Sequence, residues 1–507
     1  MNIYTICFIA LIPIVWLMIS LGVLKMPGHK TCPATLLLTA ILAVVVWKMP
    51  ISDVVSAALE GTALAIWPII LVIVAAVFTY NVSLYTKSMD TIKKMMISIT
   101  TDKRILVLIL AWGFGGFLEA IAGFGTAVAI PAGIMTALGF DPIFAAVICL
   151  IANTTPTAFG AIGIPVTTLA EITNIDVMQL SYAVGLQLLF LIVIIPIVLV
   201  MLTGKSIKSI KGVFMIALAS GLSFAVPQVL VTKYMGPELP AIIGSITCMI
   251  VTIAMAKIFY KDSASKDVKR ISFKKAILAW LPFILVFVFI ILSSSLFPTI
   301  NTGLSKIQST FYIYTGSNAD PFTFLWIATP GTLIIIATFI GGLIQGAKFS
   351  ELVSVLVKTI NQMGKSAITI IAIVAMAKIM GYSGMIKSIA AVLVAVTGEY
   401  YPLMSPIIGA LGTFVTGSDT SANVLFGGLQ VEVANTLGLN PYWLAAANTG
   451  GATAGKMISP QSIAVATAAT GLAGAEGKIL NATLKFCIAF VIVLGIMAYF
   501  MAPLFGF

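Results

Sequence analysis

Residues 138–165 read LGFDPIFAAVICLIANTTPTAFGAIGIP, and residues 437–460 read LGLNPYWLAAANTGGATAGKMISP. Each stretch begins with Leu-Gly-X-Asp/Asn-Pro, continues as an apolar run, and breaks at Ala-Asn-Thr, with a glycine and a proline following at the same spacing. Short apolar segments interrupted by glycine at corresponding places in two halves of a chain are typical of half-helices in membrane carriers. The matching breaks therefore predict an internal structural repeat.

The composition places the chain in a membrane. Hydrophobic residues make up 60% of the 507 residues and charged residues 9%, against roughly 45–50% and about 25% in soluble domains. Apolar stretches of about 20 residues, the length that spans a bilayer as a helix, recur from end to end. Backbone groups find no water in lipid, so these stretches must be helical. The first one, Ile3 to Leu24, is too long for a cleaved signal peptide and is expected to be a retained span.

The basic residues lie mainly in short loops between apolar spans. The formal net charge is +11, but this placement indicates orientation in a membrane rather than nucleic-acid binding, because Lys and Arg collect on the cytoplasmic side. The loops that hold Lys87 to Arg104, Lys205 to Lys211 and Lys257 to Lys275 are expected inside, and the loop from Pro298 to Phe324 outside. The five cysteines show no pairing or metal-ligand spacing and are expected to be buried, reduced thiols.

Uninterrupted apolar spans account for most of the predicted crossings. They run from Ile3 to Leu24, Thr31 to Lys48, Leu59 to Tyr80, Val177 to Thr203, Gly212 to Val231, Ala241 to Tyr260, Ala276 to Phe297, Leu325 to Gln345 and Leu480 to Leu504. Between Arg104 and Lys205 both flanks face the cytoplasm, so the chain must cross an even number of times. The simplest solution makes the region near 105–139 a re-entrant hairpin and the region near 142–170 one broken crossing. Three full crossings satisfy the same parity.

The C-terminal half is expected to repeat this order upside down. A single crossing through Ala367 to Thr397 places Glu399 outside, so the hairpin near 402–436 enters from that side, and a broken helix near 440–474 follows. The length of 367–397 also allows two short passes.

The predicted fold is thus an all-α polytopic membrane protein with about 12 transmembrane helices plus two re-entrant hairpins in two inverted repeats. Residues 1–260 form the N-terminal repeat, residues 261–275 a cytoplasmic basic loop, and residues 276–507 the C-terminal repeat, with both termini outside.

Four strings resemble the bacterial L-lactate permease family. They are GFGTAVAIP at 123–131, ANTTPTAFGAIGIP at 152–165, TGSDTSANVLFGGLQ at 416–430 and ANTGGATAGKMISPQSIAVA at 447–466. The likeness covers nearly the whole chain. It implies import of L-lactate and related 2-hydroxy monocarboxylates such as glycolate, coupled to protons.

A carboxylate carried through lipid needs a partner for its charge. Arginine is the usual bidentate partner, but the two arginines, Arg104 and Arg270, fall in loops. Recognition is therefore expected from half-helix N-termini, from hydroxyl and amide side chains, and from lysine. The breaks supply these candidates for substrate binding: Gly123, Gly125 and Thr126; Asn153, Thr154 and Thr155, with Thr157; Ser418, Thr420 and Ser421, with Asn423; Asn448, Thr449 and Ser459, with Gln461. The alternative is that these small residues only allow close helix packing.

Three charged residues fall inside the apparent core: Glu119, Asp419 and Lys456. Lys456 is the candidate that attracts the substrate carboxylate, and Glu119 and Asp419 are the candidates for proton coupling. Lys456 is expected to pair with Asp419 and hold it ionised, whereas Glu119 has no cation in its own half between Arg104 and Lys205. Glu119 is therefore favoured as the proton carrier. A purely structural ion pair between Asp419 and Lys456 is the alternative.

Other charged residues are weaker candidates. Glu60, Lys378 and Lys387 lie near predicted helix ends, where long side chains can reach the interface. The single histidine, His29, is expected to be a solvated residue of a short loop, although its chemistry suits a proton switch. No Walker pattern, metal-ligand cluster or nucleophile elbow occurs in the sequence, so neither an enzyme nor a cofactor is expected.

The best prediction is a proton-coupled monocarboxylate symporter of the bacterial cytoplasmic membrane that moves hairpin-bearing repeats against a scaffold. Its partners are then the substrate, protons and the lipid bilayer. A sodium-coupled organic-anion carrier is the runner-up, because unwound backbone carbonyls can coordinate sodium. A channel or an intramembrane enzyme is the alternative from a different class. The preferred hydroxy acid, the stoichiometry and the oligomeric state do not follow from the sequence.

Overall fold

The structure, a computed structural model, describes residues 2–17, 19–20, 24, 26–97, 100–121, 123, 125–260, 272–293, 297–316, 319, 321–472 and 475–507. Most of these residues form helices, which confirms the predicted fold class. Most of the predicted basic loop, residues 261–271 with Arg270, lies outside the described residues. Ala122 and Phe124 in the tip of the first hairpin do so too.

Among the described residues, ten helices are long and apolar enough to cross a membrane, or eleven if one bent pair counts as a span. They are α2 (Gly28–Val45); α3, η2 and α4 (Ile51–Leu64, Ala65–Ile70, Leu71–Tyr85); α6, η3 and α7 (Lys103–Val107, Leu108–Phe114, Gly115–Ile121); α11 (Val177–Thr203); α12 (Phe214–Tyr234); α13 (Pro240–Phe259); α14 (Phe273–Ser293); α17 (Phe349–Ser383); α18, η7 and α19 (Met385–Thr397, Gly398–Tyr400, Tyr401–Thr416); and α23 (Glu476–Phe500). Three shorter helices are also apolar: α1 (Ile3–Leu17), α8 (Thr126–Ala137) and α16 (Pro330–Ile344). This set is close to the predicted number of about 12.

A helix reversal and a bent helix pair lie at the residues predicted to form the first hairpin and broken helix, and the re-entrant path of the hairpin stays a prediction. The helix that ends with α7 turns back into α8 at Gly125, which has a left-handed backbone with φ +85°. Such a conformation suits glycine because it lacks a β-carbon. The bent pair follows as α9 (Pro142–Ala152), η4 (Thr155–Phe159) and α10 (Gly160–Thr173), with a bend of 51°.

The C-terminal half repeats this order with one shifted boundary. Helices α19 and α20 (Asp419–Leu437) meet at Gly417, and α21 (Pro441–Lys456) and α22 (Pro460–Thr470) meet at a second break. The predicted single crossing from Ala367 to Thr397 is wrong in its bounds. The long helix is α17, and it ends at Gly384, whose φ of +86° starts a separate helix, α18.

The remaining elements lie in connections. They are α5 (Ser88–Ile97), η5 (Ile207–Ile210), α15 (Pro298–Ser305), β1 (Gln308–Phe311), β2 (Phe322–Leu325) and α24 (Ala502–Phe505). The strands pair antiparallel, with Gln308 opposite Leu325, in the loop that the sequence places outside.

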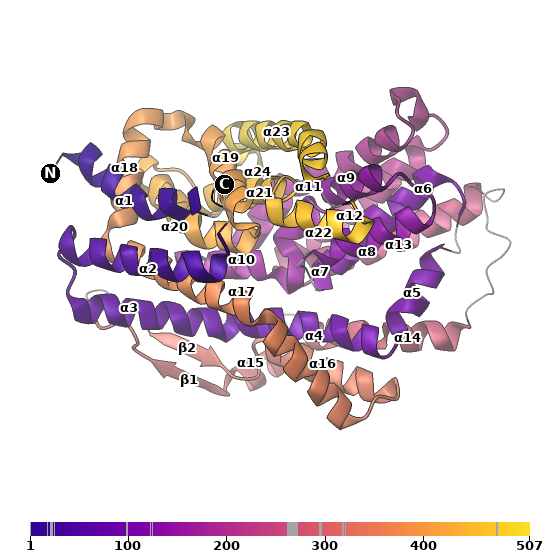
Figure 1. The fold of residues 1–507 in the computed structure, drawn as a ribbon, viewed down its shortest axis with the longest axis horizontal. Helices are drawn as coiled ribbons and strands as arrows, with labels where there is room; N and C mark the ends of the chain where they lie inside the picture. Colours follow the sequence, from indigo (N-terminus) through magenta and orange to yellow (C-terminus); the bar gives the residue numbers. More distant parts are fainter. Residues whose placement is uncertain are drawn as a thin grey trace.

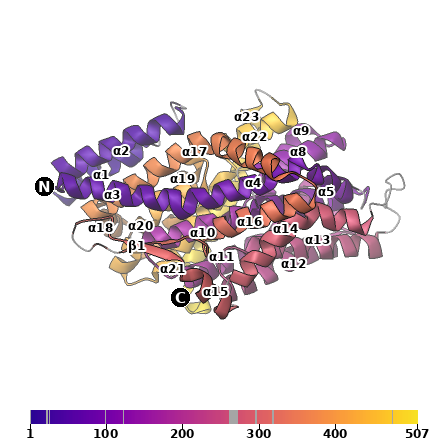
Figure 2. The ribbon, with the colours of Figure 1, turned by 90° about the horizontal axis from the view of Figure 1, so that it is seen from below.

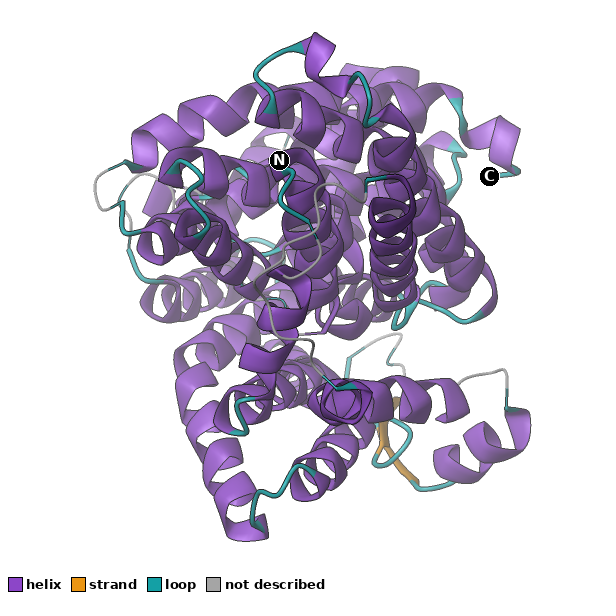
Figure 3. Cartoon of the chain, turned by 90° about the vertical axis from the view of Figure 1, so that its right-hand side faces the viewer, coloured by secondary structure: helices purple, strands orange, loops and turns teal. Residues whose placement is uncertain are grey.

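The helices group into two bodies. The first, here called the scaffold body, contains α2, α3, η2, α4, α14, α16 and α17, which run side by side along the long axis in Figures 1 and 2. The second, here called the hairpin body, contains α6 to α13 and α19 to α23. Viewed along the long axis, the two bodies lie one above the other, and the strands belong to the lower one (Figure 3). They contact each other mainly where α10 meets α4 and α20 meets α17.

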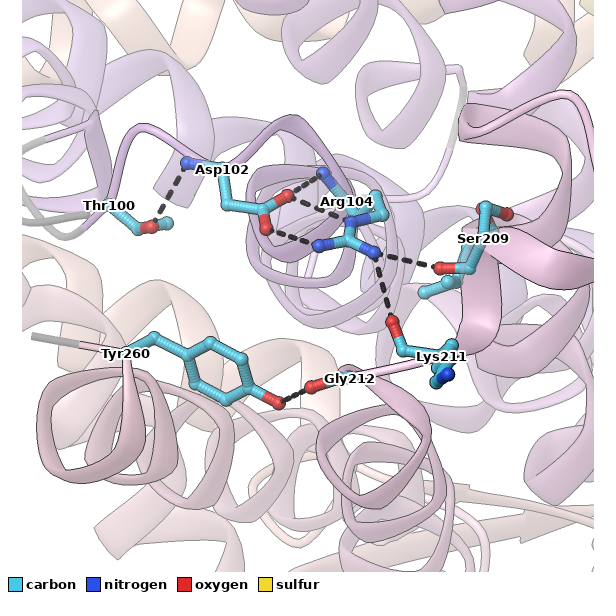
Figure 4. Close-up of polar contacts among 8 residues, drawn as sticks. Thr100, Asp102, Arg104, Ser209, Lys211, Gly212 and Tyr260 are labelled. Carbon is cyan, nitrogen blue, oxygen red and sulfur yellow. Dashed lines mark hydrogen bonds and ion pairs between the residues drawn. The ribbon is translucent and has the colours of Figure 1, made fainter. Parts of the chain in front are cut away.

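Arg104 ties the base of the first hairpin to the loop after α11 (Figure 4). Its Nη1 donates to the carbonyls of Ser209 at 2.8 Å and Lys211 at 3.4 Å, and its Nη2 forms an ion pair with Asp102 at 2.8 Å. Nearby, the Tyr260 hydroxyl donates to the carbonyl of Gly212. Burial acts to raise the pKa of Asp102, but the Arg104 guanidinium and its hydrogen bonds hold that pKa below its ordinary value.

Candidate functional site

A cavity of about 530 Å³ lies between the two bodies. Its walls on the scaffold side come from the start of α2, from Ile73 of α4 and from α17 between Lys365 and Ile373. Its walls on the other side come from both hairpin tips and both broken helices. The predicted residues that line the cavity are Glu119, Gly123, Gly125, Thr157, Ser418, Asp419, Thr420, Ser421, Lys456 and Gln461. Residues from all four sequence breaks therefore surround one space.

Lys456 forms an ion pair with Glu119, and not with Asp419. The Nζ of Lys456 lies 2.5 Å from Oε1 of Glu119, although the two residues are 337 positions apart. Gly160 leaves room for this contact, since a β-carbon there would lie 2.8 Å from Oε1 of Glu119. The predicted pairing of Lys456 with Asp419 is wrong, and Glu119, which has no cation in its own half of the chain, finds one in the other half.

Asp419 is the unpaired carboxylate of the cavity. It is the first residue of α20 and is 3% exposed, and neither of its carboxylate oxygens has a hydrogen-bond partner among the described residues. The charges of Lys456 and Glu119 both act on it. A buried carboxylate without donors is unfavourable in its charged form, and it can be relieved by a proton or by a cation.

Helix N-termini border the cavity beside these charges. Gly125 caps α8, Ser418 caps α20, and Ser459 caps α22, whose first residues Pro460 and Gln461 line the cavity. The Oγ of Ser418 accepts a hydrogen bond from the backbone N–H of Ser421 at 3.3 Å. The unpaired N–H groups and the dipole at a helix N-terminus favour negative charge. Lys456 and these helix ends can together receive a small carboxylate.

Asn448 and Thr449 do not line the cavity. Both donate to Oδ1 of Asn423 at 2.9 Å, Asn448 accepts from Gln430 at 3.1 Å, and Asn423 donates to the carbonyl of Pro165 at 3.1 Å. All four side chains are buried. This network joins the second hairpin to both broken helices, so these residues hold the walls of the cavity in position.

The other predicted residues lie behind the cavity wall. The Thr126 hydroxyl donates to the carbonyl of Gly123 at 2.8 Å, and Ser459 accepts from the N–H of Ser462 at 3.2 Å. Thr154 donates to the carbonyl of Leu150 at 3.5 Å. Asn153 and Thr155 are buried in the break after α9, and Oδ1 of Asn153 and Oγ1 of Thr155 have no hydrogen-bond partner among the described residues.

Sequence reasoning missed the contribution of the scaffold body. His29 was expected in a solvated loop, but it lies in the first turn of α2 and lines the cavity. Lys365 was not among the predicted site residues, but it lies within α17 and lines the cavity as well. The Pro-Gly before His29, a helix-start signal, indicates that α2 begins there.

Glu60 and Lys378 also differ from expectation. Instead of reaching to an interface, they form a buried ion pair at 2.8 Å between α3 and α17, and the Tyr382 hydroxyl donates to the same oxygen of Glu60 at 2.8 Å. This pair lies inside the scaffold body and lines neither cavity. It fixes the two longest helical runs to each other.

A second cavity, of about 470 Å³, lies between the same two bodies. Its walls include Trp67 and Thr329 of the scaffold body and Thr167 and Glu171 of α10. Ile164 lines both cavities, so the first turn of α10 separates them.

This separating turn has an unusual backbone. Ala161, Ile162 and Gly163 all have left-handed backbones, with φ of +44°, +61° and +77°. A β-branched residue such as isoleucine rarely adopts this conformation, and strain of this kind collects at functional sites. The turn is thus a narrow, strained partition between the two cavities.

Comparison with known proteins identifies the family of this chain. A sequence model of the L-lactate permease family matches residues 7–505. The chain belongs to the L-lactate permease family. It is 58% identical to the L-lactate permease of Streptococcus iniae, over 86% of this chain and 93% of that protein. It is 37% identical to the glycolate permease GlcA of Escherichia coli K12, over 98% and 96%. With the L-lactate permease of Bacillus subtilis it shares 34% identity, over 97% and 94%.

A structural comparison gives a weaker likeness. The YdaH transporter of Alcanivorax borkumensis aligns with a TM-score of 0.45 and 13% identity, over 86% of this chain and 85% of that one. This member of the L-lactate permease family has about ten apolar helices among its described residues. It is therefore a multi-pass protein of the bacterial cytoplasmic membrane. They point to a transporter rather than an enzyme.

Proposed function

We propose that this chain imports L-lactate and related 2-hydroxy monocarboxylates, such as glycolate, together with protons. The names of its relatives support this substrate class, since they include L-lactate permeases and a glycolate permease. The observation that carries the proposal is the juxtaposition of Lys456, the N-termini of α20 and α22, and the unpaired Asp419 around one cavity. It offers a positive region for a carboxylate and a separate acid for a proton.

The substrate is bound through its two functional groups. Its carboxylate lies between Lys456 and the N-terminus of α20, where the ammonium and the free N–H groups compensate the negative charge. Its 2-hydroxyl group lies beside the polar side chains of Ser421 and Gln461, which line the same space. Lys456 then exchanges part of its contact with Glu119 for contact with the substrate.

The proton is carried by Asp419. Glu119 forms an ion pair with Lys456, so its negative charge already has a partner in the cavity. Asp419 has no partner among the described residues and borders the cavity, so a proton removes its unfavourable charge when it is enclosed. Protonation of Asp419 also reduces its repulsion of an incoming carboxylate, which couples the two binding events.

Transport proceeds by movement of the hairpin body against the scaffold body. Both cavities lie between these bodies, and Ile164 in the first part of α10 lines both of them. A shift of α10 past α4 can therefore close one cavity while the other is open, which is alternating access around a site carried by the hairpin body.

Uptake into proteoliposomes tests the proposal. Purified protein should accumulate L-lactate when the medium is more acidic than the lumen, without any sodium in either solution. Glycolate should compete, and acetate, which lacks the 2-hydroxyl, should compete less well. If a sodium gradient alone drives accumulation of L-lactate, the coupling ion is sodium and not the proton. If neither gradient drives uptake of L-lactate, the proposal is wrong.

A further inference from the structure

Two basic side chains face the exposed end of the central cavity. Lys365 is exposed and His29 is half-buried, whereas Glu119 and Asp419 at the other end are buried. The start of α2 lies close to α17 here, because a β-carbon on Gly28 would lie 3.2 Å from the side chain of Thr369. Thr369 lies one turn beyond Lys365 and donates its hydroxyl to the Lys365 carbonyl at 3.1 Å.

Among the described residues, the elements packed around this mouth bring no carboxylate to it, since Glu351 of α17 lies in the first turn of that helix and does not line the cavity. The described part of α1 has no charged residue, and α4 has none. On α3, Asp53 lies in the first turn and Glu60 is paired with Lys378 of α17. The remaining charged residues that line the cavity are Glu119, Lys456 and Asp419 at its buried end. Neither Lys365 nor His29 has an ion-pair partner among the described residues.

The second cavity provides an internal comparison. There, Gly331 follows a proline at the start of α16 and packs against Leu71 of α4, much as Gly28 packs against Thr369 of α17. The ionisable residues that line this second cavity are Glu171 and Glu238. The second cavity is therefore lined by acidic side chains, whereas the mouth of the central cavity has two basic ones and belongs to the same cavity as Lys456.

We infer that Lys365 and His29 form a second binding site for a monocarboxylate anion at the mouth of the central cavity. This inference rests on the proposed transport of lactate. An anion that leaves Lys456 passes the Lys365 ammonium before it reaches the bulk solution, and the imidazole of His29 adds a hydrogen-bond donor. The N-terminus of α2 adds its positive end to the same place.

Transport measured from each face of the membrane tests this site. Wild-type protein and the variants Lys365→Gln, Lys365→Arg and His29→Gln are reconstituted in one known orientation, and the KM for L-lactate is measured at each face. We expect Lys365→Gln to raise the KM about tenfold at the face that carries the 205–211 loop, and less than twofold at the opposite face. Lys365→Arg should stay near the wild-type value, and His29→Gln should raise the same KM about threefold.

Matched controls and ionic strength separate binding from a structural effect. Lys358→Gln, on an exposed position of α17 outside the cavity, and Lys30→Gln, next to His29, should leave both KM values unchanged. Because an exposed charge is screened by salt, the wild-type KM at this face should rise with ionic strength, and Lys365→Gln should lose that dependence. If wild-type protein transports lactate but Lys365→Gln and Lys358→Gln have the same KM values, the proposed site at the mouth is wrong and the proposed function stands. Wild-type protein that does not transport lactate overturns the proposed function.

Discussion

Lys456 and Glu119 make the closest charged contact of the central cavity. Removal of one partner from a buried ion pair leaves the other charge uncompensated, at a cost of about 3–5 kcal/mol. We therefore expect Glu119→Ala and Lys456→Ala each to lower the melting temperature of the detergent-solubilised protein by more than the double variant does. Thermal unfolding followed by tryptophan fluorescence measures this. If the melting temperature of the double variant falls by as much as the two single decreases added together, the ion pair does not stabilise the fold.

Asp419 allows a test of coupling that leaves substrate binding intact. Asp419→Asn mimics the protonated acid, so we expect it to exchange labelled lactate across the membrane but to lose accumulation driven by a proton gradient. Counterflow and gradient-driven uptake in the same proteoliposomes measure the two activities. Asp141→Asn is the matched control, because Asp141 caps α9 outside both cavities and asparagine caps a helix equally well. Accumulation by Asp419→Asn would return the coupling role to Glu119.

At the residue scale, the sequence identified the charged groups but not their pairing. Glu119, Asp419 and Lys456 were predicted to be functional because charge inside an apolar segment is costly, and all three line one cavity. The partner of Lys456 was mistaken, because a pairing inferred within one half ignores contacts between halves. Lys365 was missed because a lysine that follows a polar run looks like the edge of a loop, whereas α17 continues through it.

Glycines set the packing between α19 and α21. A β-carbon on Gly451 or Gly455 would collide with the backbone carbonyl of Pro406 or Ala410, whereas one on Gly450 would lie 3.3 Å from the flexible side chain of Leu494. Overpacking typically costs about 1–3 kcal/mol and more when backbone must move. We expect Gly451→Ala and Gly455→Ala to lower the melting temperature and the yield of monodisperse protein well below those of Gly450→Ala. Equal behaviour of the three variants would contradict this packing.

The anchor at Arg104 provides a second test at the scale of elements. Arg104→Gln removes the ion pair with Asp102 and the donors to Ser209 and Lys211. We expect the melting temperature at pH 7 to fall by several degrees. The lowered pKa of Asp102 stabilises the folded state above the ordinary pKa of an aspartate, and this stabilisation disappears as the pH falls through the lower, folded value. The difference in melting temperature between wild type and variant should therefore become smaller below about pH 4. A difference that does not change with pH would exclude the ion pair as its cause.

Element boundaries were predictable where residue chemistry marks them. Gly125 and Gly417 both take left-handed backbones at the predicted hairpin tips, and Pro142 and Pro441 both begin the helices that follow. The end of α17 was missed because Gly384 stands within apolar sequence that suits one continuous span equally well. The hydrophobicity of a segment predicts that it lies in the membrane, but it does not determine the residue at which a helix ends.

At the scale of the whole molecule, the contacts support our proposal that the chain contains two inverted repeats. Helix α2 packs on α17 while α16 packs on α4, and α1 packs on α18 while α14 packs on α5. In these four pairs, helices of one half therefore meet helices of the other half in a corresponding way. In Figure 1 the first hairpin lies toward the right-hand end of the molecule, with α6, and the second toward the left-hand end, with α18 and α20. These contacts between the two halves explain why the site combines residues from all four breaks.

Inversion and alternating access together predict how single cysteines react. The five native cysteines are all buried, so introduced ones can be labelled selectively by a membrane-impermeant thiol reagent. Ser366→Cys in the central cavity and Thr167→Cys in the second cavity should be labelled from opposite faces of the membrane. Lactate with an inward proton gradient should change the two labelling rates in opposite directions, because movement of α10 past α4 opens one cavity as it closes the other. Ile207→Cys and Tyr312→Cys, at positions 74% and 70% exposed on different loops, should each react at a constant rate from one face. Labelling of both cavity positions from the same face would contradict the inverted arrangement, and parallel changes in their rates would contradict the movement.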